Sequence, residues 1–88
     1  MFFVYVIWNG SRFYVGQTHD LETRVAQHND PKNTFSKFTK RYPGPWELVH
    51  QEEFPSRKEA MAREKQLKSG QGRAWLKANV LPEQKEDG

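Results

Sequence analysis

Five polar side chains lie where the sequence pattern predicts strand or helix faces that should be largely apolar. They are Tyr5, Tyr14, Arg24, His28 and Glu64. Phenol and imidazole groups transfer protons, a guanidinium holds a phosphate through paired hydrogen bonds, and a carboxylate oxygen suits Mg²⁺. Phosphodiester hydrolysis needs these groups, because water must be deprotonated, the phosphate held and the leaving oxygen stabilised.

Arg24 and His28 are unusual in their predicted helix. Leu21 and Val25 mark its apolar stripe, and at about 100° per residue Arg24 and His28 flank that stripe. In a later predicted helix Glu64 falls about 40° from Ala60, in the middle of the predicted core face between Leu67 and Met61. Charged groups are thus expected at the core edge of two helices.

An unpaired buried charge costs several kcal/mol, so Arg24 and Glu64 each need a partner. One alternative is a structural salt bridge between them, with the arginine stem along the core edge. The other is a cleft where a metal ion or a phosphate supplies the opposite charge. A tyrosine in a strand is usually a core residue, but two of them beside Arg24, His28 and Glu64 favour the second alternative.

The strands and helices that position these residues follow from local signals. An apolar run, FFVYVIW, stops at Asn9-Gly10 and is followed by RFYVG, which predicts a β-hairpin with strands near residues 2–8 and 12–16, the second ended by Gly16. Thr18 or Asp20 caps a helix over residues 20–29, which Pro31 stops.

The second half predicts one more strand and two helices. A polar loop with at most one helical turn, near residues 35–40, precedes a strand over residues 46–54. Ser56 and Glu59 have capping-box spacing for a helix over residues 57–68, which Gly70 and Gly72 end. A last helix over residues 73–80 covers the core with Trp75 and Leu76.

These elements predict a small α+β domain. Its order is β-β-α-β-α-α, with a three-stranded antiparallel or mixed sheet flanked by helices. The domain spans residues 1–81, and residues 82–88 form a disordered polar tail. That tail holds one lysine against three acids, so residues 1–81 carry a formal charge of +5 where the whole chain carries +3.

Basic residues gather between the first helix and the third strand. This segment combines lysine and arginine with phenylalanine and tyrosine, as expected of a surface that binds phosphates and bases, although a solvated loop is an equal alternative. The candidate nucleic-acid contacts are Lys37, Lys40, Arg41 and, farther along, Lys68.

Composition excludes several other classes of protein. The chain has no cysteine, which removes disulfides, thiolate metal sites and cysteine nucleophiles. Its apolar opening is too short to span a membrane, so we expect a cytoplasmic protein. His19 and His50 lack zinc spacing, and there is no phosphate-binding glycine loop.

The ordered set of motifs resembles the GIY-YIG endonuclease superfamily, especially its small stand-alone, UvrC-like members. The two signature tyrosines resemble Tyr5 in VYV and Tyr14 in YVG, and the helix signature resembles Arg24 with His28. The metal-ligand glutamate resembles Glu64 in AREKQLK. Gln17 stands where UvrC-type members tend to have lysine.

The resemblance implies a nuclease that uses one Mg²⁺ or Mn²⁺ ion on Glu64 and acts on nucleic acid. We expect DNA as its substrate, with RNA left as an open alternative. It implies that Tyr5 and Tyr14 share the role of base, with His28 as a partner or alternative base. Many nucleases of this kind carry a separate DNA-binding domain that this sequence lacks, which predicts weak, structure-selective binding and a targeting protein partner. The oligomeric state is left open.

Two other functions stay open at this point. The basic aromatic segment also fits a nucleic-acid-binding module with a vestigial nuclease site. A structural domain, in which Arg24 and Glu64 form only an ion pair, is the third hypothesis.

Overall fold

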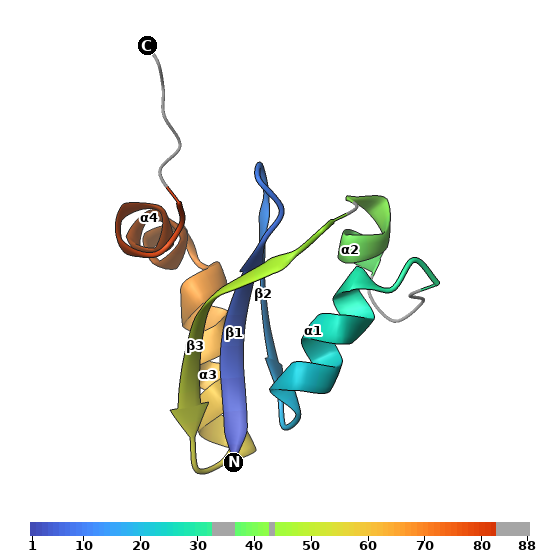
Figure 1. Ribbon diagram of the computed structural model, residues 1–88. Helices are drawn as coiled ribbons and strands as arrows, with labels where there is room; N and C mark the ends of the chain where they lie inside the picture. Colours follow the sequence, from blue (N-terminus) through green and yellow to red (C-terminus); the bar gives the residue numbers. More distant parts are fainter. Residues whose placement is uncertain (33–36, 43, 83–88) are drawn as a thin grey trace.

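The computed structural model describes residues 1–32, 37–42 and 44–82 of the chain (Figure 1). Their elements run in the order β1 (Phe2–Trp8), β2 (Phe13–Thr18), α1 (Leu21–Asn29), α2 (Lys37–Arg41), β3 (Glu47–Phe54), α3 (Arg57–Lys68) and α4 (Gly70–Asn79). This order confirms the predicted α+β class. The predicted turn near residues 35–40 is observed as α2 where the chain is described, and residues 35 and 36 lie outside that part.

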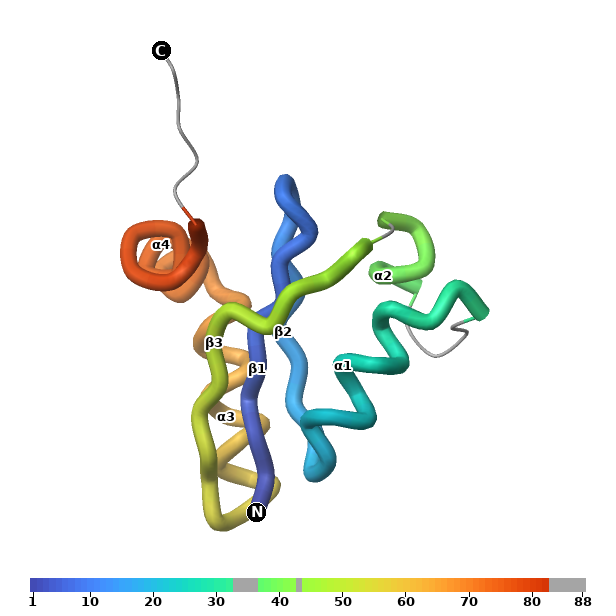
Figure 2. Tube along the Cα trace, viewed as in Figure 1, coloured from blue at the N-terminus to red at the C-terminus, as the bar shows by residue number. Residues whose placement is uncertain are grey.

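The sheet is antiparallel throughout, with strands in the order β2-β1-β3 (Figure 2). The predicted hairpin is confirmed. At its turn Gly10 has a φ of 102°, and the Asn9 side chain accepts hydrogen bonds from the backbone N–H groups of Ser11 and Arg12. Because β1 is central, its side chains are covered on both faces.

The second strand is longer than predicted. Gly16 does not end β2, which continues to Thr18. Gly16 pairs with Tyr5, and a Cβ atom on it would lie 2.6 Å from the Tyr5 hydroxyl. The glycine is therefore required because the Tyr5 ring lies against its backbone.

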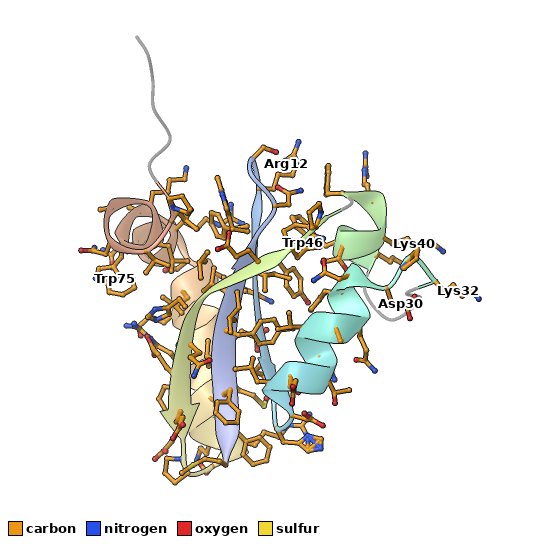
Figure 3. All side chains as sticks on the ribbon, in the orientation of Figure 1. Arg12, Asp30, Lys32, Lys40, Trp46 and Trp75 are labelled. Carbon is orange, nitrogen blue, oxygen red and sulfur yellow. The ribbon has the colours of Figure 1, made fainter. Side chains whose placement is uncertain are left out.

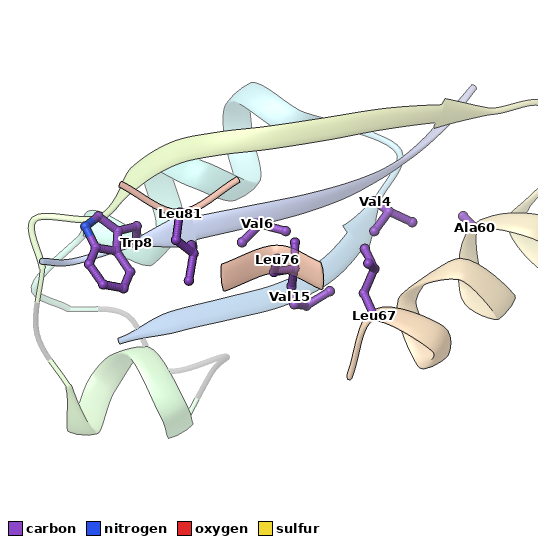
Figure 4. Packing of buried hydrophobic residues seen from close by; sticks show 8 residues of the cluster. All are labelled: Val4, Val6, Trp8, Val15, Ala60, Leu67, Leu76 and Leu81. Atoms are coloured by element: carbon purple, nitrogen blue, oxygen red, sulfur yellow. The ribbon is translucent and has the colours of Figure 1, made fainter. Parts of the chain in front are cut away.

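The two faces of the sheet carry separate apolar clusters. One contains side chains from β1 and β2 packed against α3 and α4 (Figure 4): Val4, Val6, Trp8, Val15, Ala60, Leu67, Leu76 and Leu81. The other contains Tyr5, Ile7 and Trp46, with side chains of α1 and α2 against them. Figure 1 accordingly shows α1 and α2 on one side of the hairpin and α3 and α4 on the other.

Caps fix where the first and third helices begin. Asp20 caps α1 by accepting a hydrogen bond from the Thr23 N–H, and Ser56 caps α3 by accepting one from the Glu59 N–H. At the other end of α1 the Asn29 amide holds both the N–H and the C=O of Trp46, at 2.6 and 2.9 Å. This contact fixes α1 to the start of β3.

The predicted end of the chain needs two corrections. Gly70 and Gly72 do not separate the last two helices, because Ser69 caps α4 and the helix starts at Gly70. Gly72 lies against the backbone of Leu67, where a Cβ would not fit. Trp75 does not cover the core: it is 41% exposed, whereas Leu76 is fully buried as predicted.

The described part of the chain reaches the predicted domain boundary at residue 81. Leu81 is buried against the α3–α4 side of the sheet. Of the predicted polar tail, residues 83–88 lie outside the described residues. No helix among the described residues has the length and apolar character needed to cross a membrane.

Candidate active site

A chain of hydrogen bonds joins Tyr5, His28 and Thr39 across three elements. Tyr5 points from the central strand, and its hydroxyl lies 2.7 Å from His28 Nε2 in the last turn of α1. His28 Nδ1 lies 3.1 Å from the Thr39 hydroxyl on α2. All three side chains are buried, so each polar group needs the partner it has.

Burial is the main influence on the protonation of the hydrogen-bonded side chains Tyr5 and His28. Burial, together with the charge of Arg24, lowers the pKa of His28 to about 4, so the imidazole is neutral at pH 7. Burial raises the pKa of Tyr5, as do Tyr14 and Glu64, while Arg24 opposes them through its charge and a hydrogen bond. Tyr5 therefore keeps its proton, and the neutral imidazole carries one proton on its two nitrogens. We assign that proton to Nδ1, facing Thr39, so that the Tyr5 hydroxyl donates to Nε2.

We expect acid to destabilise the fold through His28. Its pKa is about 4 when folded and about 6.5 when unfolded, so between these values only the unfolded state binds the proton. The free energy of unfolding should fall by on the order of 2–3 kcal/mol as the pH drops from 6.5 to 4. Urea unfolding across this range would measure it. His28→Gln should flatten the dependence, whereas His19→Gln, at an exposed position, should preserve it; an equal slope in all three proteins would contradict the assignment.

Tyr14 lies beside this chain on the edge strand β2. Its ring centre is 5.0 Å from that of His28 and 6.4 Å from that of Tyr5. Unlike Tyr5, Tyr14 is only half-buried, and no hydrogen bond to its hydroxyl comes from the described residues. Its hydroxyl is thus the phenol of the pair that solvent can reach.

Arg24 connects the hydrogen-bonded side chains of Tyr5, His28 and Thr39 to a pocket at the surface. Besides its contact with Tyr5, it lines a pocket of about 390 Å³ at the end of β2. The other lining residues are Phe2, Gln17, Thr18, His19 and Arg57. With two guanidinium groups and no carboxylate in its lining, this pocket suits an anion.

Glu64 lies at the edge of the core. The helical wheel predicts a position in the middle of the core face, and this prediction is wrong. Met61 is 50% exposed, so the buried stripe of α3 runs through Ala60 and Leu67 and leaves the Glu64 side chain 22% exposed. Its carboxylate pairs with Lys68, at 2.9 Å, and not with Arg24 as in the expected structural salt bridge. Its charge still reaches Tyr5, whose pKa it raises.

One carboxylate is all that this site offers a metal ion. Within residues 1–32, 37–42 and 44–82, no group of three histidine or acidic side chains is close enough together to hold one. The residues present fit Mg²⁺ or Mn²⁺ nonetheless, since Mg²⁺ commonly takes one or two carboxylates and completes its shell with water and substrate phosphate. Glu64 is partly exposed and provides such an oxygen.

The predicted basic surface is exposed beside His28. Lys37, Lys40 and Arg41 all lie on α2 with exposed side chains. Lys40 lines a second pocket, of about 480 Å³, together with His28 and Thr39. Lys68 is separate from them: it lies on α3, with its Nζ 5.9 Å from the centre of the Tyr14 ring.

The structure thus brings the predicted site residues into one region, through direct contacts among Tyr5, Tyr14, Arg24 and His28 and through the charge of Glu64. It also adds two residues that sequence reasoning missed. Thr39 is polar and buried inside a short helix, and Arg57 is the first residue of α3, next to its cap. Neither carried a local signal, since both reach the site through the packing of distant segments.

Comparison with known proteins agrees with this arrangement. A model of the GIY-YIG catalytic domain matches residues 1–77. A UPF0213 protein of Staphylococcus epidermidis (strain ATCC 35984) is 38% identical over 68 residues, 76% of this chain and 79% of that protein. UPF0213 protein YazA of Bacillus subtilis is 41% identical over 63 residues, 72% and 61% of the two chains.

A UPF0213 protein of Halobacterium salinarum is 42% identical over 69 residues, which are 77% of this chain and 86% of that protein. No solved structure gives a significant match. The family expected from the order of the tyrosine, arginine and glutamate motifs is therefore confirmed. The chain belongs to the GIY-YIG catalytic domain family, a family of endonucleases that generally use divalent metal ions.

Proposed function

We propose that this protein is an endonuclease that hydrolyses phosphodiester bonds in DNA, with Mg²⁺ or Mn²⁺ on Glu64. The observation that carries the proposal is the buried chain from Tyr5 through His28 to Thr39, which opens toward Arg24 and an anion pocket. An imidazole that is neutral at pH 7 and hydrogen-bonded to a phenol has a lone pair that can take a proton while water attacks the phosphate.

Tyr5 and Tyr14 divide the handling of the proton in this proposal. Tyr5 is fully buried and donates its own proton to His28 Nε2, so it accepts one from water only while passing its own to the imidazole. Tyr14 has the hydroxyl that solvent reaches, and it orients the attacking water beside the pair. His28 is then the final proton acceptor, and Thr39 holds the tautomer that leaves Nε2 free of a proton.

Arg24 and Arg57 hold the phosphate groups. Arg24 lies between Tyr5 and the anion pocket, so its guanidinium is suited to hold the scissile phosphate against the proton acceptor. Arg57 lies in the same pocket as Gln17, the position where a lysine was expected from the family resemblance. We assign Arg57 to an adjacent phosphate, where it supplies the positive charge that Gln17 lacks.

Glu64 would hold the divalent ion, which when bound stabilises negative charge on the leaving oxygen. The Glu64 carboxylate now pairs with Lys68, so binding of an ion competes with this salt bridge. Lys68 is partly exposed and beside Tyr14, and once released it is free to contact the substrate. The cofactor is therefore expected to bind weakly without nucleic acid.

The surface around the site favours a nonspecific or structure-selective enzyme. The described residues expose Lys37, Lys40 and Arg41 along α2, a surface suited to phosphates and not to reading base edges. Binding should weaken steeply with salt, so that a protein partner would be needed to target the enzyme. The absence of cysteine suits the reducing environment of a cytoplasmic protein.

A panel of labelled substrates tests the proposed function. Single-stranded, duplex, flapped and branched DNA, and the matching RNAs, would be incubated at low salt with Mg²⁺, Mn²⁺ or EDTA. We expect cleavage of DNA that EDTA abolishes. Salt-sensitive binding without cleavage in any metal would instead favour a nucleic-acid-binding module with a vestigial site, for which the Lys68 salt bridge that neutralises Glu64 is the supporting observation.

We expect Arg57→Ala to weaken DNA binding at every sequence. Because Arg57 would neutralise one phosphate, the slope of log affinity against log salt concentration should become smaller by about 1. Fluorescence anisotropy between 50 and 200 mM salt, roughly the range where such effects are largest, measures this slope. Lys58→Ala, at the next position of α3 and exposed, is the matched control. Equal slopes for the two variants would show that Arg57 does not contact a phosphate of the bound DNA.

A further inference from the structure

Trp75 lies beside β3, at the edge of the sheet opposite the candidate active site. The other two tryptophans, Trp8 and Trp46, are at most 9% exposed, whereas Trp75 on α4 is 41% exposed. Figure 3 shows Trp75 on the opposite side of the sheet from Lys40. Trp75 therefore presents part of a large aromatic ring to solvent, where a ligand can reach it.

The Trp75 ring has a fixed support on its inner side. The edge of the His50 ring lies against it, with centroids 5.8 Å apart, and the Arg63 guanidinium lies 5.5 Å from its centre. Arg63 donates to both Glu52 oxygens, at 2.8 and 3.0 Å, and to the Gln66 side chain. The indole thus packs on a cation whose own position is fixed by three hydrogen bonds.

The surface next to this ring is hollow and carries several polar groups among apolar ones. A pocket of about 290 Å³ lies beside Trp75, lined also by Arg63, Gln66, Leu67, Gln71 and Gly72. Gln66 and Gln71 bring amide groups, which can both donate and accept hydrogen bonds, to the side of an aromatic face. This is the combination that recognises a planar heterocycle, since the ring stacks and its edge is hydrogen-bonded.

Charge around the ring is balanced. Helix α4 carries no acidic residue, and its two cations, Arg73 and Lys77, lie about 160° around the helix from Trp75, with the Arg73 guanidinium over the Phe13 ring of β2. The carboxylate in contact with the support, Glu52, already pairs with Arg63 and His50, and the hydrogen bond from Arg63 lowers its pKa. Its negative charge is therefore compensated and does not repel a phosphate backbone.

We propose that Trp75 is a stacking site for an unpaired base of a single-stranded nucleic acid, with Gln66 and Gln71 along the base edge. The site lies by β3, whereas Tyr14 and the anion pocket lie by β2 at the other edge of the sheet. A substrate with a single-stranded arm would contact both edges. The proposal rests on the proposed function only in that the partner is a nucleic acid.

Intrinsic fluorescence tests this site directly, because Trp75 is the exposed tryptophan and Trp8 and Trp46 are buried. Titration with unlabelled oligo-dT at low salt should quench the wild-type protein, and Trp75→Ala should lose this quenching. The affinity of Trp75→Ala for a labelled oligonucleotide, measured by anisotropy, should fall roughly 5- to 100-fold, and the affinity of Trp75→Phe should fall less. Cleavage of a blunt duplex should be unchanged in both variants.

Equal single-strand affinity in wild type and Trp75→Ala, with both proteins folded by circular dichroism, would overturn the stacking site whatever the nuclease assay gives. Lys65→Ala, which removes an exposed charge from α3, is the control for a merely electrostatic effect. A loss as large in Lys65→Ala as in Trp75→Ala would also overturn it. If Trp75-dependent binding is found and no metal supports cleavage, the site stands and the proposed nuclease activity fails.

Discussion

Glu64→Gln should reduce metal-dependent cleavage at least about 100-fold and leave the protein folded. Loss of a residue that only orients a metal ligand typically costs 10- to 100-fold, so loss of the only proposed carboxylate ligand should cost at least as much. Glutamine keeps the size of the side chain but lacks the negative charge that attracts the ion. Single-turnover cleavage at saturating Mg²⁺, with thermal unfolding of the same sample, measures both effects.

The fold should tolerate this substitution for a physical reason. Glu64 is partly exposed and its partner Lys68 is about half exposed, and i,i+4 pairs of this kind contribute only about 0.3–0.5 kcal/mol. Glu53→Gln, which removes an exposed carboxylate from β3, is the matched control and should cleave normally. Full activity in Glu64→Gln would mean that the ion is held elsewhere, or that none is needed.

Arg24→Met should reduce the cleavage rate roughly 100- to 1,000-fold, the usual cost of removing a preorganised donor that stabilises transition-state charge. Methionine preserves the apolar stem that runs along α1 but carries no donor. Arg24→Lys should recover only part of the rate, because an ammonium group does not make paired hydrogen bonds to a phosphate. Rates under saturating DNA separate this effect from weaker binding.

Two comparisons make the Arg24 result specific. Lys65→Met, an exposed substitution on α3 that also removes one positive charge, should cleave within a few-fold of the wild type. Thermal unfolding of Arg24→Met distinguishes a local loss of chemistry from a general loss of structure. Should Arg24→Met cleave normally while it unfolds at a lower temperature, Arg24 would be a structural residue and the assigned phosphate contact would be wrong.

Local signals were sufficient for most of the fold. Asn9-Gly10 places the hairpin because the turn needs a residue with positive φ, and Ser56 starts α3 because its side chain satisfies a free N–H group. Both effects act within a few residues of the chain. Glycine is the exception: local rules predict that Gly16 and Gly72 end elements, although each is required by the close approach of another segment.

The candidate site was partly readable for a similar reason. Helical periodicity alone places Arg24 and His28 on the inner side of α1, and strand alternation places Tyr5 inside the sheet. The residue types and their order then indicated the chemistry. The partner of His28 had no such signature, as the burial of Thr39 inside a short helix illustrates.

The sequence by itself determined the class of the fold, the bounds of α3 and the set of side chains around which the site is built. Only the tertiary structure decided that Tyr5 and His28 share a hydrogen bond, that Arg57 joins Arg24 in one pocket, and that Trp75 is partly exposed to solvent. Caps, turns and periodicity depend on neighbours in the chain, whereas hydrogen-bond partners, pockets and exposure depend on how segments far apart in the sequence pack together.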